Sequence, residues 1–274
     1  MMDDDVQLTT HNVRELTEEE SSQLAMDTVL LTPFKRQKLE KEAKKNWDLF
    51  YKRNTTKFFK DRHWTTREFK ELCSEDNKNS NVSSKRYMLE VGCGVGNAVF
   101  PLIEEGCQLY IYACDFSPRA IDFVKGNSLY DEAKCHAFVC DITCDDLTLS
   151  IPAATINIAT LIFVLSAITP QKMSAAIANI GKVMATGGTL LFRDYGIYDH
   201  AMLRFSRGHK IDDNFYVRQD GTMAYFFSEE ATRKLFIGEG FEVVTCEYVY
   251  RQTVNKKENL SVPRVFLQGK FKKL

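Results

Sequence analysis

Three glycines on alternate positions mark the place where this sequence is best suited to hold a small molecule. They lie in EVGCGVGN, residues 90–97, directly after a short apolar run. Glycine tolerates positive φ and has no Cβ, so the main chain can approach a ligand closely at the end of a strand. We therefore expect Gly92, Gly94 and Gly96 to surround a bound ligand.

The spacing of these glycines excludes one common ligand class. Dinucleotide-binding loops follow the pattern G-x-G-x-x-G, whereas here the third glycine comes one residue early and is followed by Asn97. No pyrophosphate cradle is predicted, and a nicotinamide-dependent reductase is disfavoured.

Two acidic residues supply the partners that a nucleoside would need. Asp115 and Asp141 each end an apolar run downstream of the glycines. The carboxylate of Asp115 could accept hydrogen bonds from the two hydroxyls of a ribose. Asp141 is followed by Ile142, and the next expected strand runs through Leu161, Ile162 and Phe163.

The segments that carry these residues alternate between expected strands and expected helices. The strands are expected at residues 85–91, 108–115, 135–141, 156–166 and 189–196, and the helices at residues 97–105, 118–125 and 170–184. Such alternation predicts right-handed crossovers and an α/β fold, with a parallel sheet covered by helices on both faces.

The C-terminal part of the chain breaks this alternation. Residues 196–227 are expected to form an irregular insertion, and a helix is expected at residues 228–237. Two long strands at residues 241–252 and 263–271 then predict an antiparallel hairpin that completes a mostly parallel, seven-stranded sheet.

The N-terminal part divides into two segments by charge. Residues 1–32 have a net charge of −7 and are expected to be flexible, whereas residues 33–80 are basic and predicted to be helical. The extension is expected to contain one helix from Pro33 and a second near residues 65–73, capped by Thr66. The main domain is assigned to residues 81–274, after a polar linker.

Composition limits the class of protein. The chain has 274 residues, of which 44% are hydrophobic and 27% charged, so it can bury a sizeable core. We expect neither a membrane span nor a secretory signal, and we expect a soluble protein of the cytoplasm, with the nucleus as a second location. The eight cysteines are expected to be reduced thiols, and no metal site is expected.

The charge distribution points to a polyanionic partner. The net charge is only −1, but residues 33–72 carry +7 and residues 251–274 carry +6. Either run alone could be a solvated helix face or strand edge. Two separate basic runs on one chain favour binding to a nucleic acid.

The pattern E-x-G-x-G-x-G-N resembles motif I of the class I methyltransferases that use S-adenosylmethionine. That resemblance implies a Rossmann-like fold with S-adenosyl-L-methionine as the cofactor. The resemblance implies that the glycines and Asp115 hold this cofactor and that the Asp141 carboxylate accepts from its adenine amino group. Ile142 would pack on one face of the adenine ring, and Leu161, Ile162 and Phe163 would cover the other.

Longer motifs narrow the resemblance to one family. They are KNWDLFYKRN (45–54), FFKDRHWTTREF (58–69), CDFSPRAI (114–121), LIFVLSAI (161–168), FRDYGIYDHAMLRF (192–205) and NFYVRQDGTMAYFFS (214–228). Together they resemble the eukaryotic methyltransferase-like family that makes 3-methylcytidine in tRNA. The resemblance runs from about residue 33 to residue 273 and implies methylation of cytidine at position 32 of the anticodon loop. Serine tRNA as substrate and seryl-tRNA synthetase as partner are implied by its closest member.

The chemistry of such a reaction can be compared with the residues present. Cytosine N3 has an in-plane lone pair, so the reaction needs in-line approach and stabilisation of positive charge on the base rather than a general base. Asp194 is expected to accept from the cytosine amino group, and we assign Tyr195 to catalysis with it. In the alternative interpretation, Asp194 pairs with Arg193 or caps the next turn.

Two mixed aromatic and basic clusters are expected to hold an extruded base and its backbone. One cluster precedes the core and contains Phe58, Phe59, Arg62, His63 and Trp64; the other follows the expected strand that carries Asp194 and contains Tyr195, Tyr198, His200, Arg204 and Phe205. Lys60, Arg193 and Arg264 are also assigned to substrate binding. Any single aromatic residue among them could instead belong to the core. Trp47 and Tyr51 share a helix face and are expected to cover the cofactor as a lid, although a buried helix contact is an equal alternative.

Two further functions remain open at this point. A methyltransferase acting on protein or a small metabolite would use the same cofactor site, but it would be expected to have a neutral substrate rim. A non-catalytic tRNA-binding subunit would be expected to have lost the glycines and strand-end carboxylates, which are present here.

Overall fold

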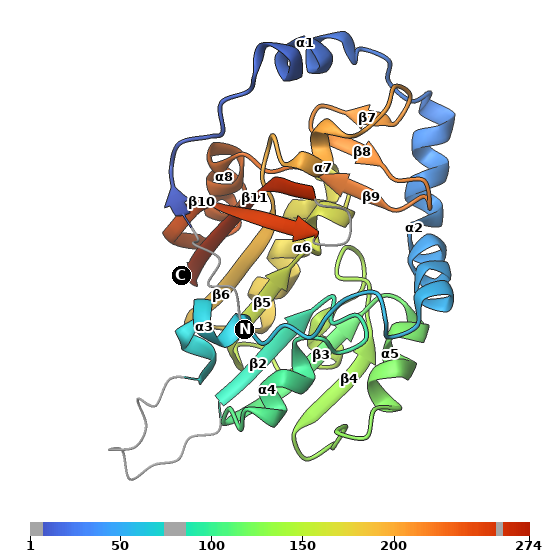
Figure 1. Cartoon of the computed structure of the whole chain (residues 1–274). Coiled ribbons are helices and arrows are strands. Elements are labelled where there is room, and N and C mark those ends of the chain that lie inside the picture. Colours follow the sequence, from blue (N-terminus) through green and yellow to red (C-terminus); the bar gives the residue numbers. More distant parts are fainter. Residues whose placement is uncertain (1–7, 74–85, 256–259) are drawn as a thin grey trace.

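A mixed sheet of eight strands forms the centre of the molecule, in the order β1-β10-β11-β6-β5-β2-β3-β4. The computed structural model describes residues 8–73, 86–255 and 260–274. The five parallel strands are β2 (Arg86–Val91), β3 (Leu109–Asp115), β4 (Cys135–Val139), β5 (Ile156–Ile162) and β6 (Met184–Tyr195). The predicted α/β fold is confirmed (Figure 1).

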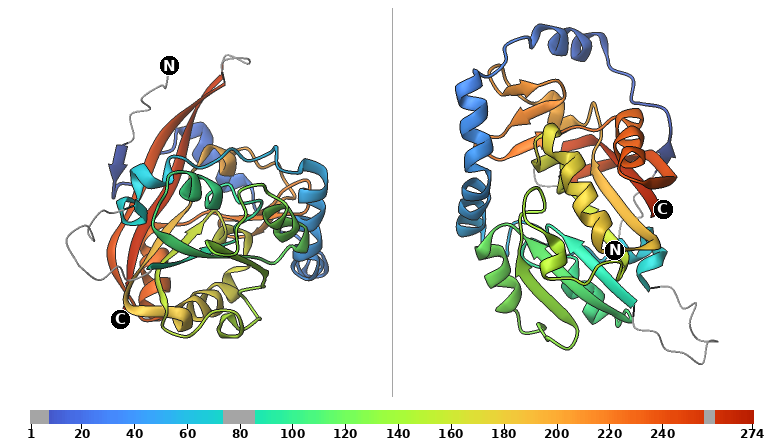
Figure 2. Two further views of the ribbon diagram at one scale, coloured as in Figure 1. Left: turned by 90° about the horizontal axis from the view of Figure 1, so that it is seen from below. Right: turned by 180° about the vertical axis from the view of Figure 1, so that it is seen from behind.

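Helices cover both faces of the sheet because consecutive strand residues point to opposite sides. Met88 packs in one core cluster with α4 (Val99–Glu104) and α5 (Pro118–Lys125), whereas Leu89 packs in the other with α6 (Pro170–Val183) and α8 (Glu229–Gly238). In the view from behind in Figure 2, α6 lies in front of the central strands.

The last two long strands form the predicted hairpin. They are β10 (Phe241–Asn255) and β11 (Leu260–Lys273), and β11 pairs antiparallel with β6. The basic C-terminal run is thus placed beside the strand that carries Asp194, since Leu267 lies opposite that residue in the register.

The insertion before this hairpin is more regular than expected. It contains α7 (His200–Leu203) and a separate antiparallel sheet of β7 (Lys210–Asp212), β8 (Phe215–Val217) and β9 (Met223–Tyr225). Short 3-10 turns, η2 (Leu147–Leu149) and η3 (Leu165–Ala167), follow β4 and β5.

The expectation of a flexible tail is wrong for residues 8–32. β1 (Leu8–Thr10) pairs with the edge of β10, and α1 (Glu18–Met26) begins with a capping box in which Thr17 and Glu20 exchange hydrogen bonds. Such pairing satisfies backbone groups that an exposed edge would leave to water. Residues 1–7 lie outside the described part of the chain.

The basic extension is helical as predicted, with one interruption. α2 (Pro33–Asn54) is continuous, but the second helix is divided into α3 (Thr65–Glu68) and η1 (Lys70–Cys73), because Phe69 leaves the helical region with φ −119° and ψ 81°. The expected cap at Thr66 is wrong, since α3 already begins at Thr65 and has no side-chain cap. The predicted linker at residues 74–85 lies outside the described residues.

The expectation that all cysteines are reduced is also wrong. Cys73, at the end of η1, forms a disulfide with Cys107, which follows α4. Six cysteines are free, and Cys144 is exposed among them. None of the helices in the described part of the chain combines the length and apolarity that crossing a bilayer requires.

Asp48 attaches the long helix α2 to the core. Its carboxylate accepts hydrogen bonds from the Ser117 hydroxyl at 2.9 Å and from the backbone N–H of Arg119 at 3.3 Å, at the beginning of α5. Burial alone would raise the pKa of Asp48, but these hydrogen bonds and the Arg119 charge outweigh it and lower the pKa. The carboxylate therefore interacts with the positive end of α5 from a different helix.

Glu90 is a carboxylate buried inside the parallel sheet. It accepts a hydrogen bond from Thr160 on β5, and the guanidinium of Arg62 lies 3.9 Å away. Burial raises its pKa from 4.5 to about 7, although the Arg62 charge and the Thr160 hydrogen bond act in the opposite direction. The folded protein must therefore hold a desolvated charge once this group ionises.

Replacing Asp48 with alanine is expected to lower the free energy of unfolding by about 1 kcal/mol, since a partly exposed carboxylate with helix-end partners contributes on that scale. Thermal melting would measure the loss, and hydrogen exchange should show faster opening of α2. Asp122→Ala, which removes an exposed carboxylate from α5, is the matched control. Equal effects of the two substitutions would contradict the attachment.

Replacing Glu90 with glutamine should change how stability depends on pH. Because the folded pKa is raised, the native state binds more protons, and stability is lost as pH rises from about 4.5 to about 7. Relative to the original protein, Glu90→Gln should gain roughly 1–3 kcal/mol between pH 5 and pH 8. Urea unfolding across this range measures it, with the exposed Glu104→Gln as control. Parallel pH profiles for Glu90→Gln and the original protein would refute the assignment.

Candidate active site

A cavity of about 330 Å³ opens at the carboxyl ends of the central strands. Its walls come from α2 and from the loops that follow β2, β3, β4 and β5, and Met223 of β9 closes one side. This is the edge where parallel sheets bind ligands, as the sequence predicts. α2 passes from α5 to the small β7–β9 sheet, so it spans the cavity (Figure 1).

The glycine loop has the backbone conformation expected of it. Gly92, which lines the cavity, has φ +61°, and a Cβ at this position would lie 2.4 Å from a methyl group of Val164. Gly94 has φ +55°, and its Cβ would lie 3.1 Å from the Tyr51 hydroxyl. Only Gly92 of the three glycines lines the cavity; Gly94 and Gly96 lie outside its lining and shape the turn, each with positive φ.

Asp115 lines the cavity and also fixes the glycine loop. Its carboxylate accepts the backbone N–H of Gly94 at 3.0 Å and that of Ser117 at 2.9 Å. Burial raises the pKa of Asp115 to about 6, against the effect of these two hydrogen bonds. The remaining acceptor capacity of the carboxylate suits a pair of hydroxyl groups.

The other predicted contacts of a nucleoside lie at the far end of the cavity. Asp141, Ile142 and Thr143 line it, and the Asp141 carboxylate accepts from the Thr143 hydroxyl at 2.7 Å. Ile162 does not line it, because its side chain is only 1% exposed and packs in the core. Phe163, the next residue, takes this position, with φ +57° where β5 ends.

Helix α2 contributes an aromatic wall. Trp47 and Tyr51 both line the cavity, and their ring centroids are 6.1 Å apart. Both rings also pack in a small cluster with Phe50, so the helix contact that the sequence left open is present, and the role of the pair as a lid over the cofactor stays a prediction. Burial raises the pKa of the Tyr51 phenol. Lys41 and Lys44 line the same side and were missed by the sequence reasoning.

Asp194 lies behind the cavity rather than in its wall. It is fully buried, and its two carboxylate oxygens accept the backbone N–H groups of Ser166 and Tyr195, each at 2.9 Å. Burial raises its pKa to about 6, against those hydrogen bonds. The hydrogen bonds that Asp194 accepts hold the end of β6 against η3. Direct contact between the Asp194 carboxylate and a substrate base therefore stays a prediction.

Arg193 is not placed as a substrate-binding residue. Its side chain is 2% exposed, forms an ion pair with Glu68 of α3, and donates to Gln268 at 3.0 Å. Its guanidinium lies 4.7 Å from the centre of the Trp64 ring. Burial lowers the pKa of Arg193 to about 10. The pairing of Arg193 with Asp194, which the alternative interpretation offered, is not found; Arg193 pairs with Glu68 instead.

Tyr195 stands at the centre of an aromatic and arginine cluster. Its ring lies 5.1 Å from that of Phe163, and the guanidinium groups of Arg218 and Arg264 lie 5.7 and 5.9 Å from its centre. Arg264 also pairs with the buried Asp199 at 2.9 Å, so its position is fixed. Phe163 faces the cavity as well, and it joins the cofactor region to this cluster.

The structure brings only part of the first predicted cluster to this region. The Arg62 guanidinium lies 5.8 Å from the centre of the Phe163 ring and donates to the Ile162 carbonyl. The Trp64 ring contacts Arg193, the residue before Asp194 on β6. The others lie away from Tyr195 or have different partners: Phe58 packs on Phe50 and Phe59, Lys60 is exposed, and His63 contacts Glu105 at 3.3 Å.

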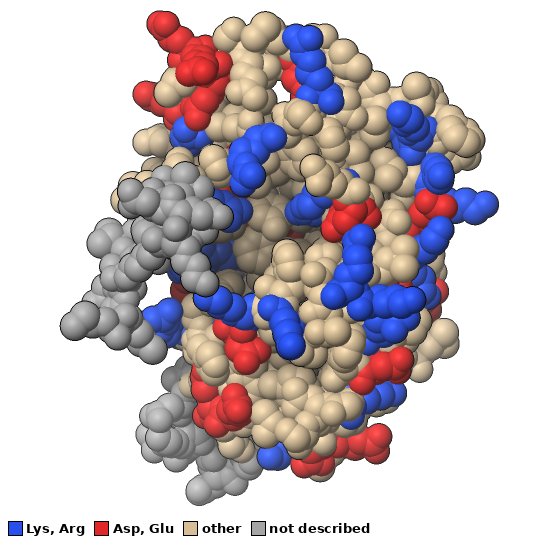
Figure 3. Space-filling model, turned by 45° about the vertical axis from the view of Figure 1, so that its right-hand side comes forward, with Lys and Arg blue, Asp and Glu red and all other residues tan. Residues whose placement is uncertain are grey.

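The second predicted cluster follows Tyr195 around α7. Tyr198 packs beside Met202, His200 is half-buried, and Arg204 is exposed. Burial, with the neighbouring Arg204 charge, lowers the pKa of His200. On the face turned forward in Figure 3, lysine and arginine side chains gather around a hollow, as binding to a polyanion requires.

Some residues of the site were missed by the sequence reasoning. Arg218 and Phe266 contact the Tyr195 region, and Asp48 holds α2. Arg218 belongs to the motif NFYVRQDGT, which assigns no role to the arginine. Because β7 and β8 lie between Tyr195 and Arg218 in the sequence, no local pattern indicates that the two residues meet.

The cavity suits S-adenosylmethionine by its shape and chemistry. The bare turn at Gly92 leaves room that a side chain would fill, Asp115 and Asp141 offer acceptors at separate places, and Trp47, Ile142 and Phe163 offer apolar surfaces. This set matches a ligand with a ribose, an adenine and a charged chain.

Comparisons with known proteins agree with this geometry. A family described as "Methyltransferase domain" matches residues 89–190. The chain is 58% identical to "tRNA N(3)-cytidine methyltransferase METTL6" of Homo sapiens, over 95% of this chain and 90% of that protein. It is 48% identical to "tRNA N(3)-methylcytidine methyltransferase trm141" of Schizosaccharomyces pombe, over 89% and 98% respectively.

A solved structure supports the fold at much lower identity. An S-adenosylmethionine-dependent methyltransferase from Anabaena variabilis superposes with a TM-score of 0.60 at 11% identity, covering 85% of this chain and 95% of that one. Fold, cofactor site and close relatives all agree: the chain belongs to the tRNA N(3)-cytidine methyltransferase family and has the class I S-adenosylmethionine-dependent fold.

Proposed function

We propose that this enzyme transfers a methyl group from S-adenosylmethionine to N3 of the cytidine at position 32 in the anticodon loop of serine tRNAs. Membership of the family supports the reaction and the class of substrate. The position and the serine tRNA rest on the motifs quoted for the family resemblance. The observation that carries the proposal is the place of Phe163, which lines the cofactor cavity and contacts Tyr195.

The cofactor is assigned to the cavity under α2. Asp115 would hold the ribose hydroxyls, Asp141 the adenine amino group, and Ile142 with Phe163 the faces of the adenine ring. Trp47 and Tyr51 would exclude water from above. The bound cofactor supplies an electrophilic methyl group, and the chain's own residues supply orientation.

The base is assigned to the cluster around Tyr195. An N3 atom lies on the Watson–Crick edge, so the cytidine must leave its stack before it can react. Tyr195 and Phe163 offer aromatic faces for the extruded ring, while the guanidinium groups of Arg218 and Arg264 lie within 6 Å of the Tyr195 ring, where they could bind the adjoining phosphates.

Asp194 is proposed to stabilise the methylated base through its negative charge. Methylation at N3 leaves a positive charge on the ring, and no proton need be removed from N3 first. The carboxylate is fixed by Ser166 and Tyr195, and a preorganised charge in a dry site acts strongly. Hydrogen bonding to the cytosine amino group would additionally require local opening beside Tyr195, because Asp194 is fully buried.

Substrate tRNA is proposed to lie across the basic hollow, with seryl-tRNA synthetase as the partner that presents it. The gathering of lysine and arginine in Figure 3 supports the first part. The second rests on the family resemblance alone. Lys60 and Phe58 are exposed in the segment between α2 and α3. They are proposed to contact other parts of the tRNA rather than the cytidine that is methylated.

Nucleoside analysis tests the proposed reaction directly. Purified protein and S-adenosylmethionine should convert cytidine to 3-methylcytidine in serine tRNA, with a larger yield when seryl-tRNA synthetase is present. Mass spectrometry of digested tRNA measures this, and serine tRNA with uridine at position 32 is the matched control. Cofactor binding without any methylated nucleoside, in either arm, would instead favour a protein or metabolite substrate, or a non-catalytic tRNA-binding role.

Replacing Asp194 with alanine should reduce tRNA methylation by about 10²–10³-fold, which is typical for loss of one preorganised electrostatic group. Cofactor binding by calorimetry should stay within about threefold, because Asp194 does not line the cavity. The isosteric Asp194→Asn guards against misfolding, and Asp213→Asn, at an exposed carboxylate of the insertion, is the control. Unchanged turnover in a folded Asp194 variant would refute the assignment.

A further inference from the structure

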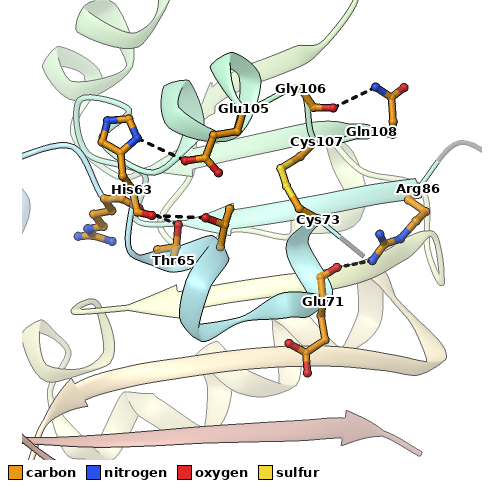
Figure 4. Close-up of a disulfide and its surroundings, with 11 residues drawn as sticks. His63, Thr65, Glu71, Cys73, Arg86, Glu105, Gly106, Cys107 and Gln108 are labelled. Carbon is orange, nitrogen blue, oxygen red and sulfur yellow. Dashed lines mark hydrogen bonds and ion pairs between the residues drawn. A yellow bond between two sulfur atoms is a disulfide. The ribbon is translucent and has the colours of Figure 1, made fainter. Parts of the chain in front are cut away.

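We propose that Cys73 and Cys107 are a redox modification site, a reversible disulfide that fastens the N-terminal extension to the methyltransferase core. The two residues are 34 positions apart, and their Cα atoms are 5.1 Å apart, within the range of natural disulfides. Both are half-buried, so a small oxidant can reach them. Figure 4 shows the bond joining η1 to the segment after α4.

The bond lies at the end of a segment that is already docked on the core. Phe69 and Leu72 are fully buried in the cluster formed with α4 and β2. Arg86 donates to the Glu71 carbonyl at 2.6 Å, and the Glu71 carboxylate pairs with Lys270 at 2.6 Å. These contacts hold the two cysteines near each other before any bond forms, so closing it requires little reorganisation.

The same segment carries the carboxylate that holds the buried arginine of β6. Glu68 pairs with both Arg193 and Arg251, and Trp64 stacks over the Arg193 guanidinium. The residues of α3 and η1 thus link the disulfide to the strand that ends in Asp194. Closing the bond limits local opening of residues 65–73, whereas reduction leaves only the non-covalent contacts to resist it.

The chemistry of closure is a thiol–disulfide exchange. A thiolate of one cysteine attacks a low-molecular-weight disulfide such as glutathione disulfide and releases one glutathione thiolate. The second cysteine then attacks the mixed disulfide and releases the other. The protein loses two protons and two electrons, and glutathione disulfide is reduced to two thiols.

A metal site is the competing use of these sulfur atoms. Both sulfurs and a carboxylate oxygen of Glu105 lie within 4.8 Å of one another, and His63 contacts Glu105 at 3.3 Å (Figure 4). Structural zinc sites take four protein ligands, whereas three groups meet here. The sulfur atoms are joined in the structure, so the redox interpretation is favoured.

Differential alkylation of the full chain tests the pairing. Reduced protein would be incubated with glutathione disulfide, blocked with iodoacetamide, reduced and labelled with N-ethylmaleimide, and its peptides then identified by mass spectrometry. We expect Cys73 and Cys107 to be protected together and Cys144 to remain open to the first reagent. Reduction should lower the melting temperature by about 5–10 °C, since the bond closes a loop of this length.

Matched variants decide among the outcomes. Cys73→Ser and Cys107→Ser should each abolish the redox-dependent change in melting temperature and the slower hydrogen exchange of residues 65–73, while Cys144→Ser should retain both. Alkylation of both thiols after oxidation, or an equal redox response in Cys73→Ser, would overturn the proposal. So would one equivalent of zinc in the reduced protein, measured by elemental mass spectrometry and lost in both serine variants.

Discussion

The site depends on carboxylates that the fold has removed from water at or near the carboxyl ends of its central strands. Burial raises the pKa of Asp115 and Asp194 to about 6 and that of Glu90 to about 7. A buried charge needs hydrogen bonds. Asp115 accepts from the backbone N–H groups of Gly94 and Ser117 in the loops after β2 and β3, and Asp194 accepts from those of Ser166 in η3 and Tyr195 at the end of β6. Asp115 and Asp194 therefore fix the backbone beside the cavity and beside the proposed base site.

The charges around the proposed base site serve two different purposes. Arg218 and Arg264 flank Tyr195 from the insertion and from β11, and Arg264 is held by the buried Asp199. Cations favour the approach of phosphates but oppose a positive charge on a methylated base. In the role proposed for it, the negative charge of Asp194, placed one residue from Tyr195 and screened little by solvent, would offset that opposition. The arrangement can thus bind a polyanion and still tolerate a cationic product.

Local sequence signals predicted the sheet, its helices and the strand-end carboxylates, because periodicity and loop position are properties of neighbouring residues. The predictions were wrong where the position of a residue depends on a partner far away in the sequence. Arg193 was assigned to substrate, yet its partner Glu68 lies 125 residues away. The disulfide between Cys73 and Cys107 and the pairing of β1 with β10 were not predicted for the same reason, since each joins parts of the chain that are far apart in the sequence. Of the predicted stretch Leu161, Ile162 and Phe163, only Phe163 lines the cavity, because Leu161 and Ile162 are buried in the core.

The cofactor cavity is closed by parts of the chain that lie outside the general methyltransferase core. The match to the methyltransferase domain covers residues 89–190, but α2 and Met223 also line the cavity. α2 is held on both sides, since Asp48 binds the start of α5 and Glu40 accepts from Thr169 before α6. The core alone would leave its cofactor site open to water. The extension and the insertion complete this cavity, and the insertion also places Arg218 beside Tyr195 in the proposed base site. Closure of the cofactor cavity and binding of the substrate therefore share one addition to a common fold, the insertion.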